Sequence, residues 1–177
     1  EDDIMSDCRN FWIPADPPRA NYFINAFLDE KRNRIEGKET ITFVNQTEKP
    51  INKIALQWGL GGKRNLVVDI NHDAVDLSKI LTKLESNRPL LFELPESILP
   101  CEAIELVIDF SAAIGELRYG MRMLTEWHPR LWWSYPTQDD FEVKLNLPNS
   151  YTVTTTGRLD ETSGTYRAGG VKQFGIV

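Results

Sequence analysis

Histidine and cysteine are scarce in this chain, which limits the catalytic and metal sites that it can hold. Among the 177 residues there are two His and two Cys. His72 and His128 belong to no HxxxH or CxxC spacing, whereas a zinc site needs about four ligands. The Gly-x-Ser-x-Gly motif that carries a nucleophilic serine is absent as well. We therefore predict no catalytic residue and no metal or cofactor site within the chain.

Basic clusters and long apolar runs are also missing. The 20 Lys and Arg residues are outnumbered by 26 Asp and Glu residues, which gives a net charge of −6. Binding to the phosphates of nucleic acid requires a concentrated basic face, so nucleic acid is excluded as a partner. No apolar run approaches the roughly 20 residues that cross a bilayer as a helix. We expect no membrane segment in this chain.

The two cysteines leave two interpretations open. Cys8 and Cys101 are either two unpaired, small apolar side chains or a disulfide that ties the N-terminal residues to the loop at Pro100. A disulfide would indicate an oxidising compartment. A count of free thiols distinguishes the two interpretations.

Residues 1–19 are predicted to form an extended N-terminal arm. They are polar and contain Pro14, Pro17 and Pro18, and proline fixes φ and donates no backbone hydrogen bond. Residues 20–177 are predicted to form a single β domain, since a chain of this length suits one domain. The last seven residues are apolar and β-rich, with no turn after them. We therefore expect the chain to be a piece of a longer, multidomain protein.

Apolar and polar residues alternate along most of the chain, which is the pattern of half-buried strands. Residues 76–84 are different, because leucines and an isoleucine recur there at helical spacing, and one short helix competes with an irregular loop. The predicted fold class is all-β, a mostly antiparallel β-sandwich or a saddle-like curved sheet of about nine strands. The expected strands are residues 22–29, 35–44, 54–58, 66–70, 90–94, 104–110, 141–147 and 151–155.

Tryptophan concentrates in one stretch, residues 126–136, where three of the five Trp residues fall. Two interpretations are open for it. His128 and Arg130 are polar groups in a cleft, with Arg130 binding an anion, or the stretch packs across a sheet edge, as buried tryptophans usually do. Exposed tryptophan rings would also suit stacking on sugars. The candidates for a substrate cleft or a domain-docking surface are Glu126, Trp127, His128, Arg130, Trp132 and Trp133.

The order of these segments resembles the N-terminal β domain of the aminopeptidase N family of zinc metallopeptidases. Residues 22–29 and 35–43 are similar to the opening hairpin of that domain, and residues 127–132 and 140–148 to the segment that closes it. At the Glu that follows the loop, the family usually has a preceding Gly, where this chain has Cys101. Further similar strands are residues 54–56, 90–94, 102–110 and 155–159.

The resemblance implies a saddle-like domain that packs against a thermolysin-like catalytic domain. The HExxH zinc motif and the Gly-x-Met-Glu-Asn substrate motif of the family do not occur in this chain, so zinc is expected in a catalytic domain outside it. The family's aromatic-Pro-Cys-x-Asp-Glu-Pro run is also missing from residues 127–133. Glu126 is the nearest carboxylate that would anchor the amino group of a peptide substrate.

Two functions follow as hypotheses. In the first, the chain is the non-catalytic N-terminal domain of a zinc metallo-aminopeptidase, which lines the substrate cleft and docks on the catalytic domain of the same parent protein. In the second, it is a separate β-sandwich module that recognises carbohydrate or peptide through Trp127, Trp132 and Trp133. The resemblance and the candidate disulfide favour an extracytoplasmic or membrane-associated parent protein.

Overall fold

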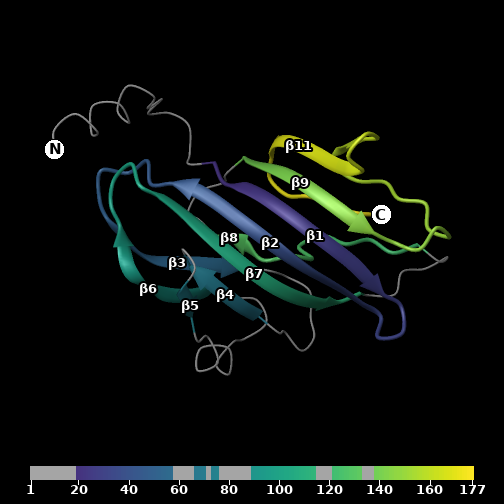
Figure 1. The fold of residues 1–177 in the computed structure, drawn as a ribbon, viewed down its shortest axis with the longest axis horizontal. Coiled ribbons are helices and arrows are strands. Elements are labelled where there is room, and N and C mark those ends of the chain that lie inside the picture. The colour runs from purple at the N-terminus through teal and green to yellow at the C-terminus, as the bar shows by residue number, and fades with distance from the viewer. Residues whose placement is uncertain (1–18, 58–65, 71–72, 76–88, 115–120, 133–137) are drawn as a thin grey trace.

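The computed structural model describes residues 19–57, 66–70, 73–75, 89–114, 121–132 and 138–177. These residues form eleven strands in two sheets, and they include no helix (Figure 1). The all-β fold class predicted from the sequence is therefore confirmed. The strands are β1 (Asn21–Asp29), β2 (Arg34–Val44), β3 (Ile51–Gln57), β4 (Leu66–Ile70), β5 (Asp73–Val75), β6 (Leu90–Ile98), β7 (Ala103–Ala113), β8 (Arg130–Leu131), β9 (Asp139–Asn146), β10 (Arg158–Asp160) and β11 (Thr165–Val171).

The larger sheet has eight strands in the order β10-β11-β9-β1-β2-β7-β4-β5. Its long central strands lie side by side and twist across the molecule (Figure 1). Its strand pairs are antiparallel except for β1 and β9, which run parallel from the pair Asn21 and Asp140 onward. Because β2 is antiparallel to both β1 and β7, β7 runs in the same direction as β9. The chain between β7 and β9, which includes residues 121–132, must therefore cross from one end of the sheet to the other.

The smaller sheet has three strands in the order β6-β3-β8 and lies behind the larger one in Figure 1. Ile54 and Leu56 of β3 and Leu131 of β8 belong to the same buried cluster as the inner residues of β1, β2, β7 and β9. The domain is thus two packed sheets that share one apolar core.

Strand alternation decides which side chains enter that core. In β1, Tyr22, Ile24 and Ala26 are buried, while Phe23 on the outer face is 54% exposed. Gly37 of β2 allows a close approach: a Cβ atom there would lie 2.7 Å from the ring of Phe110. The lack of a side chain at Gly37 therefore leaves room for the Phe110 ring, which also packs against Trp127.

The expected strands differ most clearly from the structure at two places. The strand expected to end before Pro95 continues to Ile98, because β6 is an edge strand with a register irregularity, where a missing N–H is tolerated. Residues 151–155 alternate as a strand does, but they pair only through an isolated bridge at Thr155. The N-terminal arm up to residue 18, Trp58 and the helix expected at residues 76–84 lie outside the described residues.

Candidate functional site

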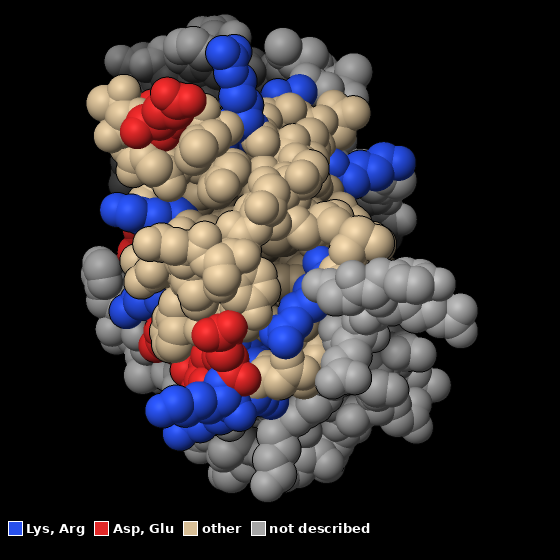
Figure 2. All heavy atoms as spheres, turned by 90° about the vertical axis from the view of Figure 1, so that its right-hand side faces the viewer, with Lys and Arg blue, Asp and Glu red and all other residues tan. Residues whose placement is uncertain are grey.

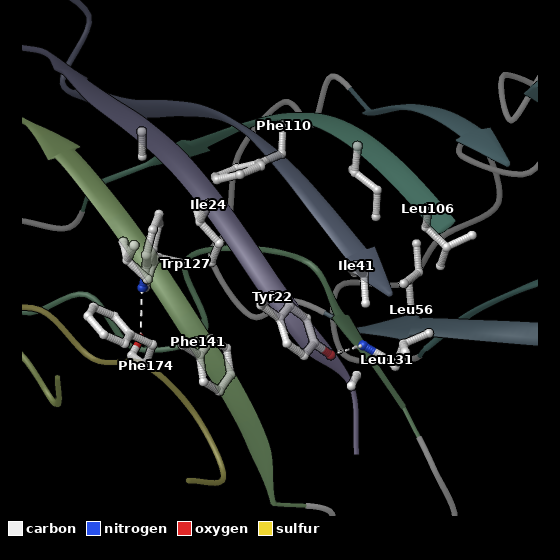
Figure 3. Packing of buried hydrophobic residues seen from close by; sticks show 14 of the residues in the cluster. Tyr22, Ile24, Ile41, Leu56, Leu106, Phe110, Trp127, Leu131, Phe141 and Phe174 are labelled. Atoms are coloured by element: carbon white, nitrogen blue, oxygen red, sulfur yellow. Dashed lines mark hydrogen bonds between the residues drawn. The ribbon is translucent and has the colours of Figure 1, made fainter. Parts of the chain in front are cut away.

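Residues 126–132 run from one sheet to the other across the inner face of the larger sheet. At one end, Trp127 packs beneath β7, with its ring centroid 5.8 Å from that of Phe110. At the other end, β8 pairs with β3, and the N–H of Trp132 donates to the carbonyl oxygen of Ala55 over 2.8 Å. The N–H of Leu131 also donates to the Tyr22 hydroxyl, 3.0 Å away (Figure 3). The stretch therefore ties the two sheets together.

Trp127 is completely buried, with 0% of its surface exposed. Its indole Nε1–H donates to the carbonyl oxygen of Phe174 over 2.8 Å, so its one polar group is satisfied inside the domain (Figure 3). Phe174 is buried as well and contacts Phe141 of β9. Trp127 thus presents no ring face to a sugar or to another domain, and its place is in the core.

His128 forms a buried pair with Glu39 of β2. His128 Nδ1 lies 2.9 Å from Glu39 Oε2 and 3.0 Å from the carbonyl oxygen of Pro129. Because a carbonyl oxygen can only accept a hydrogen bond, His128 must carry a proton on Nδ1 to donate to the carbonyl oxygen of Pro129. Glu39 Oε1 and His128 Nε2 are buried and have no hydrogen-bond partner. The imidazole ring packs edge to face against three aromatic rings, those of Tyr22, Trp127 and Phe141.

Burial favours the uncharged form of both members of this pair. It lowers the pKa of His128 to about 3, with a further lowering by the positive charge of Arg130, while the hydrogen bond to the carbonyl oxygen of Pro129 raises it. Burial also raises the pKa of Glu39 well above its ordinary value. With side-chain exposures of 1% for His128 and 0% for Glu39, neither group can exchange a proton with a bound substrate in this structure. The pair belongs to the core of the domain.

Of the other residues in the stretch, Trp132 and Glu126 are the most exposed, and the Arg130 side chain is 19% exposed. Trp132 is 46% exposed, and the Glu126 side chain is 41% exposed. Glu126 has a φ of 52°, which is unusual for a residue with a side chain. Arg130 donates from Nη1 to the carbonyl oxygen of Lys172 over 2.6 Å, and its Nη2 lies 3.8 Å from Glu126 Oε1. Glu126, Arg130 and Trp132 are therefore the candidates from this stretch that can touch another molecule, while Trp133 lies outside the described residues.

Among the residues that the structure describes, no three His, Cys, Asp or Glu side chains come close enough together to bind a metal ion. The same residues contain no helix with the length and apolarity to span a membrane.

Cys101 is disulfide-bonded and sits in the turn between β6 and β7, with a φ of 69°. Its N–H donates to the carbonyl oxygen of Asn45 over 2.8 Å, which fixes the turn to the end of β2. Cys8 lies outside the described residues, so its pairing with Cys101 stays a prediction.

Two buried polar residues of this region were missed in the sequence. Glu39 stands two positions before Ile41, so strand alternation alone places it on the core face. Asp139, whose charge is typical of the polar entry to a strand, is 3% exposed and accepts a hydrogen bond from the N–H of Ala20. A charged residue at a core-facing position was the signal available in both cases.

No protein-family model matches the sequence, and no curated protein sequence matches it either. Solved structures do match its fold. With the M1 zinc metallopeptidase from Deinococcus radiodurans, the TM-score is 0.60 at 14% identity, over 91% of this chain and 41% of that one. For a mutant of that enzyme bound to a Tyr-Ser-Ala substrate, the TM-score is 0.61 at 15% identity, over 88% of this chain and 41% of that one.

Leukotriene A4 hydrolase from Saccharomyces cerevisiae gives a TM-score of 0.59 at 13% identity, over 98% of this chain and 32% of the hydrolase. The chain therefore spans about two fifths of the length of the bacterial enzyme and about a third of the yeast one. At these identities the likeness shows the fold: nearly all of this chain folds as one part of these larger enzymes does.

Proposed function

We propose that the chain is the non-catalytic N-terminal β domain of an M1-type zinc metallopeptidase with aminopeptidase-like activity. The observation that carries the proposal is the fold, which matches M1 metallopeptidases over 91% of this chain while covering 41% of theirs. The proposal is also supported by the sequence itself, because the order of its strand segments resembles that of the same family. In this proposal, catalysis and zinc belong to a catalytic domain of the same parent protein, which binds the peptide substrate.

The exposed part of the tryptophan stretch is proposed to line the substrate cleft. The core residues Trp127 and His128 hold this part in place, the carboxylate of Glu126 lies 3.8 Å from the guanidinium of Arg130, and Trp132 presents a half-exposed indole ring. A non-Gly residue in the left-handed region costs on the order of 1–3 kcal/mol, and such residues cluster at ligand sites. We infer that Glu126 is held in this conformation to direct its carboxylate toward the amino group of a peptide.

The disulfide-bonded state of Cys101 supports an oxidising location for the parent protein, since structural disulfides persist in such compartments. We propose an extracytoplasmic location on this basis. Thiol labelling of the protein from its native cells, without reduction, checks it: Cys101 should resist labelling, and rapid labelling of an unfolded sample would contradict the location.

The decisive experiment compares the chain with the protein translated from its complete gene. The complete protein should contain an HExxH motif, hold about one zinc ion per molecule by mass spectrometry of metals, and hydrolyse aminoacyl-arylamides. The chain by itself should bind no stoichiometric zinc and show no hydrolysis. Zinc binding or hydrolysis by the chain, or a complete gene without a zinc motif, would overturn the proposal.

The cleft assignment is tested in the complete protein by Glu126→Gln, with Glu161→Gln at the exposed turn after β10 as its matched control. Loss of a charge-assisted contact to the substrate amine is expected to raise KM about tenfold, at roughly 1.5–3 kcal/mol per such hydrogen bond. Folding, followed by thermal unfolding, should be unchanged. Equal KM values for both variants would remove Glu126 from the cleft.

A further inference from the structure

The outer face of the larger sheet carries a groove of about 370 Å³. It crosses β11, β9, β1 and β2, which lie side by side in Figure 1. Residues at paired positions of neighbouring strands point to the same face of a sheet, so the register arranges the lining in two rows. One row joins Thr40, Phe23 and Glu142, and the next joins Thr42, Asn21 and Asp140. We call this lining the outer groove.

Phe23 supplies the apolar surface of the outer groove. Its neighbours at the paired positions, Thr40 and Glu142, are polar, and its ring is 54% exposed. Neighbouring strands lie about 4.8 Å apart, so the groove runs for roughly 14 Å across four strands. Because an aromatic ring presents a large, flat apolar surface, the apolar face of a pyranose ring can stack on Phe23.

The uncharged polar side chains of the outer groove can both donate and accept hydrogen bonds. Within the part of the chain that the structure describes, the side chains of Asn21, Thr40 and Thr42 form no hydrogen bond. An amide and a hydroxyl group each donate and accept, as the hydroxyl groups of a sugar do. These three side chains therefore match a ligand that is rich in hydroxyl groups.

Asp140 and Gly169 form one end of the outer groove. Oδ1 of Asp140 accepts a hydrogen bond from the N–H of Gly170 over 2.8 Å, which holds the carboxylate in place. A Cβ atom at Gly169 would lie 3.2 Å from the same oxygen. A larger residue at position 169 would therefore crowd Asp140, whereas glycine leaves its carboxylate accessible to a ligand.

Charges of both signs line the outer groove. Arg167 also lines it, with its Nε 3.6 Å from Glu142 Oε1, and donates from Nη1 to Asp160 Oδ2 over 2.7 Å. Figure 2 likewise shows acidic and basic side chains interspersed among uncharged residues on the side of the molecule that it draws. A strongly charged ligand would meet repulsion from one of the two signs, so the lining favours a neutral ligand.

We propose that the outer groove binds a neutral oligosaccharide of pyranose sugars. One sugar ring stacks on Phe23, and the hydroxyl groups of that ring and of its neighbour bond to Asn21, Thr42 and Asp140. This inference goes beyond the proposed metallopeptidase function. The groove lies on the face of the sheet opposite to the tryptophan stretch, and it needs neither zinc nor a catalytic domain.

Calorimetric titration of the complete protein tests the site with neutral trisaccharides: cellotriose, chitotriose and maltotriose. At least one of them should bind with a Kd of about 1 mM or below. Its affinity should change little between about 0.05 and 0.5 M sodium chloride, since salt screens charges and a neutral sugar carries none. The proposal is overturned if none of the trisaccharides binds. Zinc content and peptide hydrolysis do not enter this measurement, so the two proposals fail separately.

Two phenylalanines of β1 provide a matched pair of variants. Phe23→Ala should weaken sugar binding about tenfold, because the stacking surface is lost. Phe27→Ala is the control, since Phe27 lies on the same face of the same strand and is 46% exposed, but does not line the groove. Its affinity should equal that of the unmodified protein. Equal affinities of the two variants would overturn the proposal.

Stacking and polar contacts are tested by two milder variants. Phe23→Trp should bind at least as tightly as the unmodified protein, because a larger ring still stacks. Thr42→Val removes one hydroxyl group and should weaken binding about threefold to tenfold, the effect of one hydrogen bond. If Phe23→Ala fails to fold, Thr42→Val still decides, because an unchanged affinity of that variant would contradict the sugar contacts.

A cationic ligand is the competing outcome. Tetralysine, titrated in the same way, should bind more weakly than the best trisaccharide. Tighter binding of tetralysine, lost at the higher salt concentration, would mark an electrostatic site made by Asp140 and Glu142 and would overturn the sugar assignment.

Discussion

The tryptophan stretch and the cavity beside Arg122 lie on the same inner side of the larger sheet, yet the first is closely packed and the second is open. In the stretch, Trp127 is completely buried, its indole N–H has a partner, and β8 is paired with β3. The cavity, of about 460 Å³, is lined by apolar side chains such as Leu28 and Ile35 and by Arg122. Both regions contain buried polar atoms without a hydrogen-bond partner, among them His128 Nε2 and Arg122 Nη1.

The difference indicates which of the two regions contributes more to the stability of this domain. Apolar and aromatic surface that is fully buried contributes to the free energy of unfolding, as the residues around Trp127 do. Side chains that border an open cavity contribute less, because part of their surface stays in contact with solvent. Substitutions in the first region should therefore lower the free energy of unfolding more than substitutions in the second.

The largest effect is expected from Trp127→Ala. Removal of a fully buried Trp typically costs about 3–5 kcal/mol, because it leaves a cavity and here also frees the carbonyl of Phe174. Urea unfolding followed by circular dichroism measures it. Trp132→Ala is the matched control, since half of that ring is already exposed. A loss below about 1 kcal/mol for Trp127→Ala would show that the stretch does not support the core.

The next effect is a pH dependence carried by His128. Its pKa of about 3 in the folded chain lies below its ordinary value of 6.5, so the unfolded chain binds a proton that the folded chain does not. The free energy of unfolding therefore falls as the pH decreases from 6.5 toward 3, at about 1.4 kcal/mol per pKa unit. His128→Gln should remove this part of the acid sensitivity, as measured by urea unfolding at several pH values.

Glu39 changes the pH dependence of the free energy of unfolding in the opposite direction to His128. Its pKa is raised above the ordinary value of 4.5, so the folded chain keeps a proton that the unfolded chain has lost. Stability from this group is present below pH 4.5 and is lost as the pH rises through the raised pKa. Glu39→Gln should flatten the stability profile on the alkaline side. If the profiles of Glu39→Gln and His128→Gln run parallel to that of the unmodified chain, the buried pair carries no pH dependence.

A smaller effect is expected at the cavity beside Arg122. Arg122→Met changes a partly exposed side chain, so the free energy of unfolding, measured by urea unfolding, should stay within about 0.5 kcal/mol of the original value. The comparison between the two regions fails if Arg122→Met destabilises the chain as much as Trp127→Ala does.

A comparably small effect on stability, under about 0.5 kcal/mol, is expected for Trp132→Ala. Its value lies in binding: in the proposed function, this variant weakens docking or substrate binding in the complete protein without changing the fold. A carbohydrate and peptide screen followed by Trp fluorescence separates this from the recognition-module hypothesis. A glycan whose binding is lost in Trp132→Ala, with the chain otherwise intact, would favour the module.

Much of the fold was predictable from particular residues. The alternation in residues 22–28 and 141–145 identified the strands and their buried faces, because a period of two leaves no other arrangement. The continuation of β6 past Pro95 was not predictable, since it depends on β6 being an edge strand. The parallel pairing of β1 with β9 also joins residues about 120 positions apart, which no local pattern reveals.

The sequence marked residues 126–136 as a candidate segment but did not separate its core residues from its exposed ones. The density of aromatic residues and prolines sets this segment apart, and the sequence left packing and cleft contacts as alternatives. The structure assigns packing to Trp127 and His128, leaves Glu126 and Trp132 partly exposed, and leaves Arg130 mostly buried. Exposure depends on which neighbours cover each side chain, and those neighbours, Phe110, Phe174 and Glu39, come from distant parts of the chain.

The sequence by itself determined the fold class, the faces of the main strands and the lack of a catalytic or zinc motif, because these depend on residue type and local period. Tertiary structure alone decided that Glu39 meets His128 in the core and that Arg122 borders a cavity with apolar side chains from distant strands. Such features are set by the register and order of strands distant in sequence, and the energies that select them arise only when the two sheets pack.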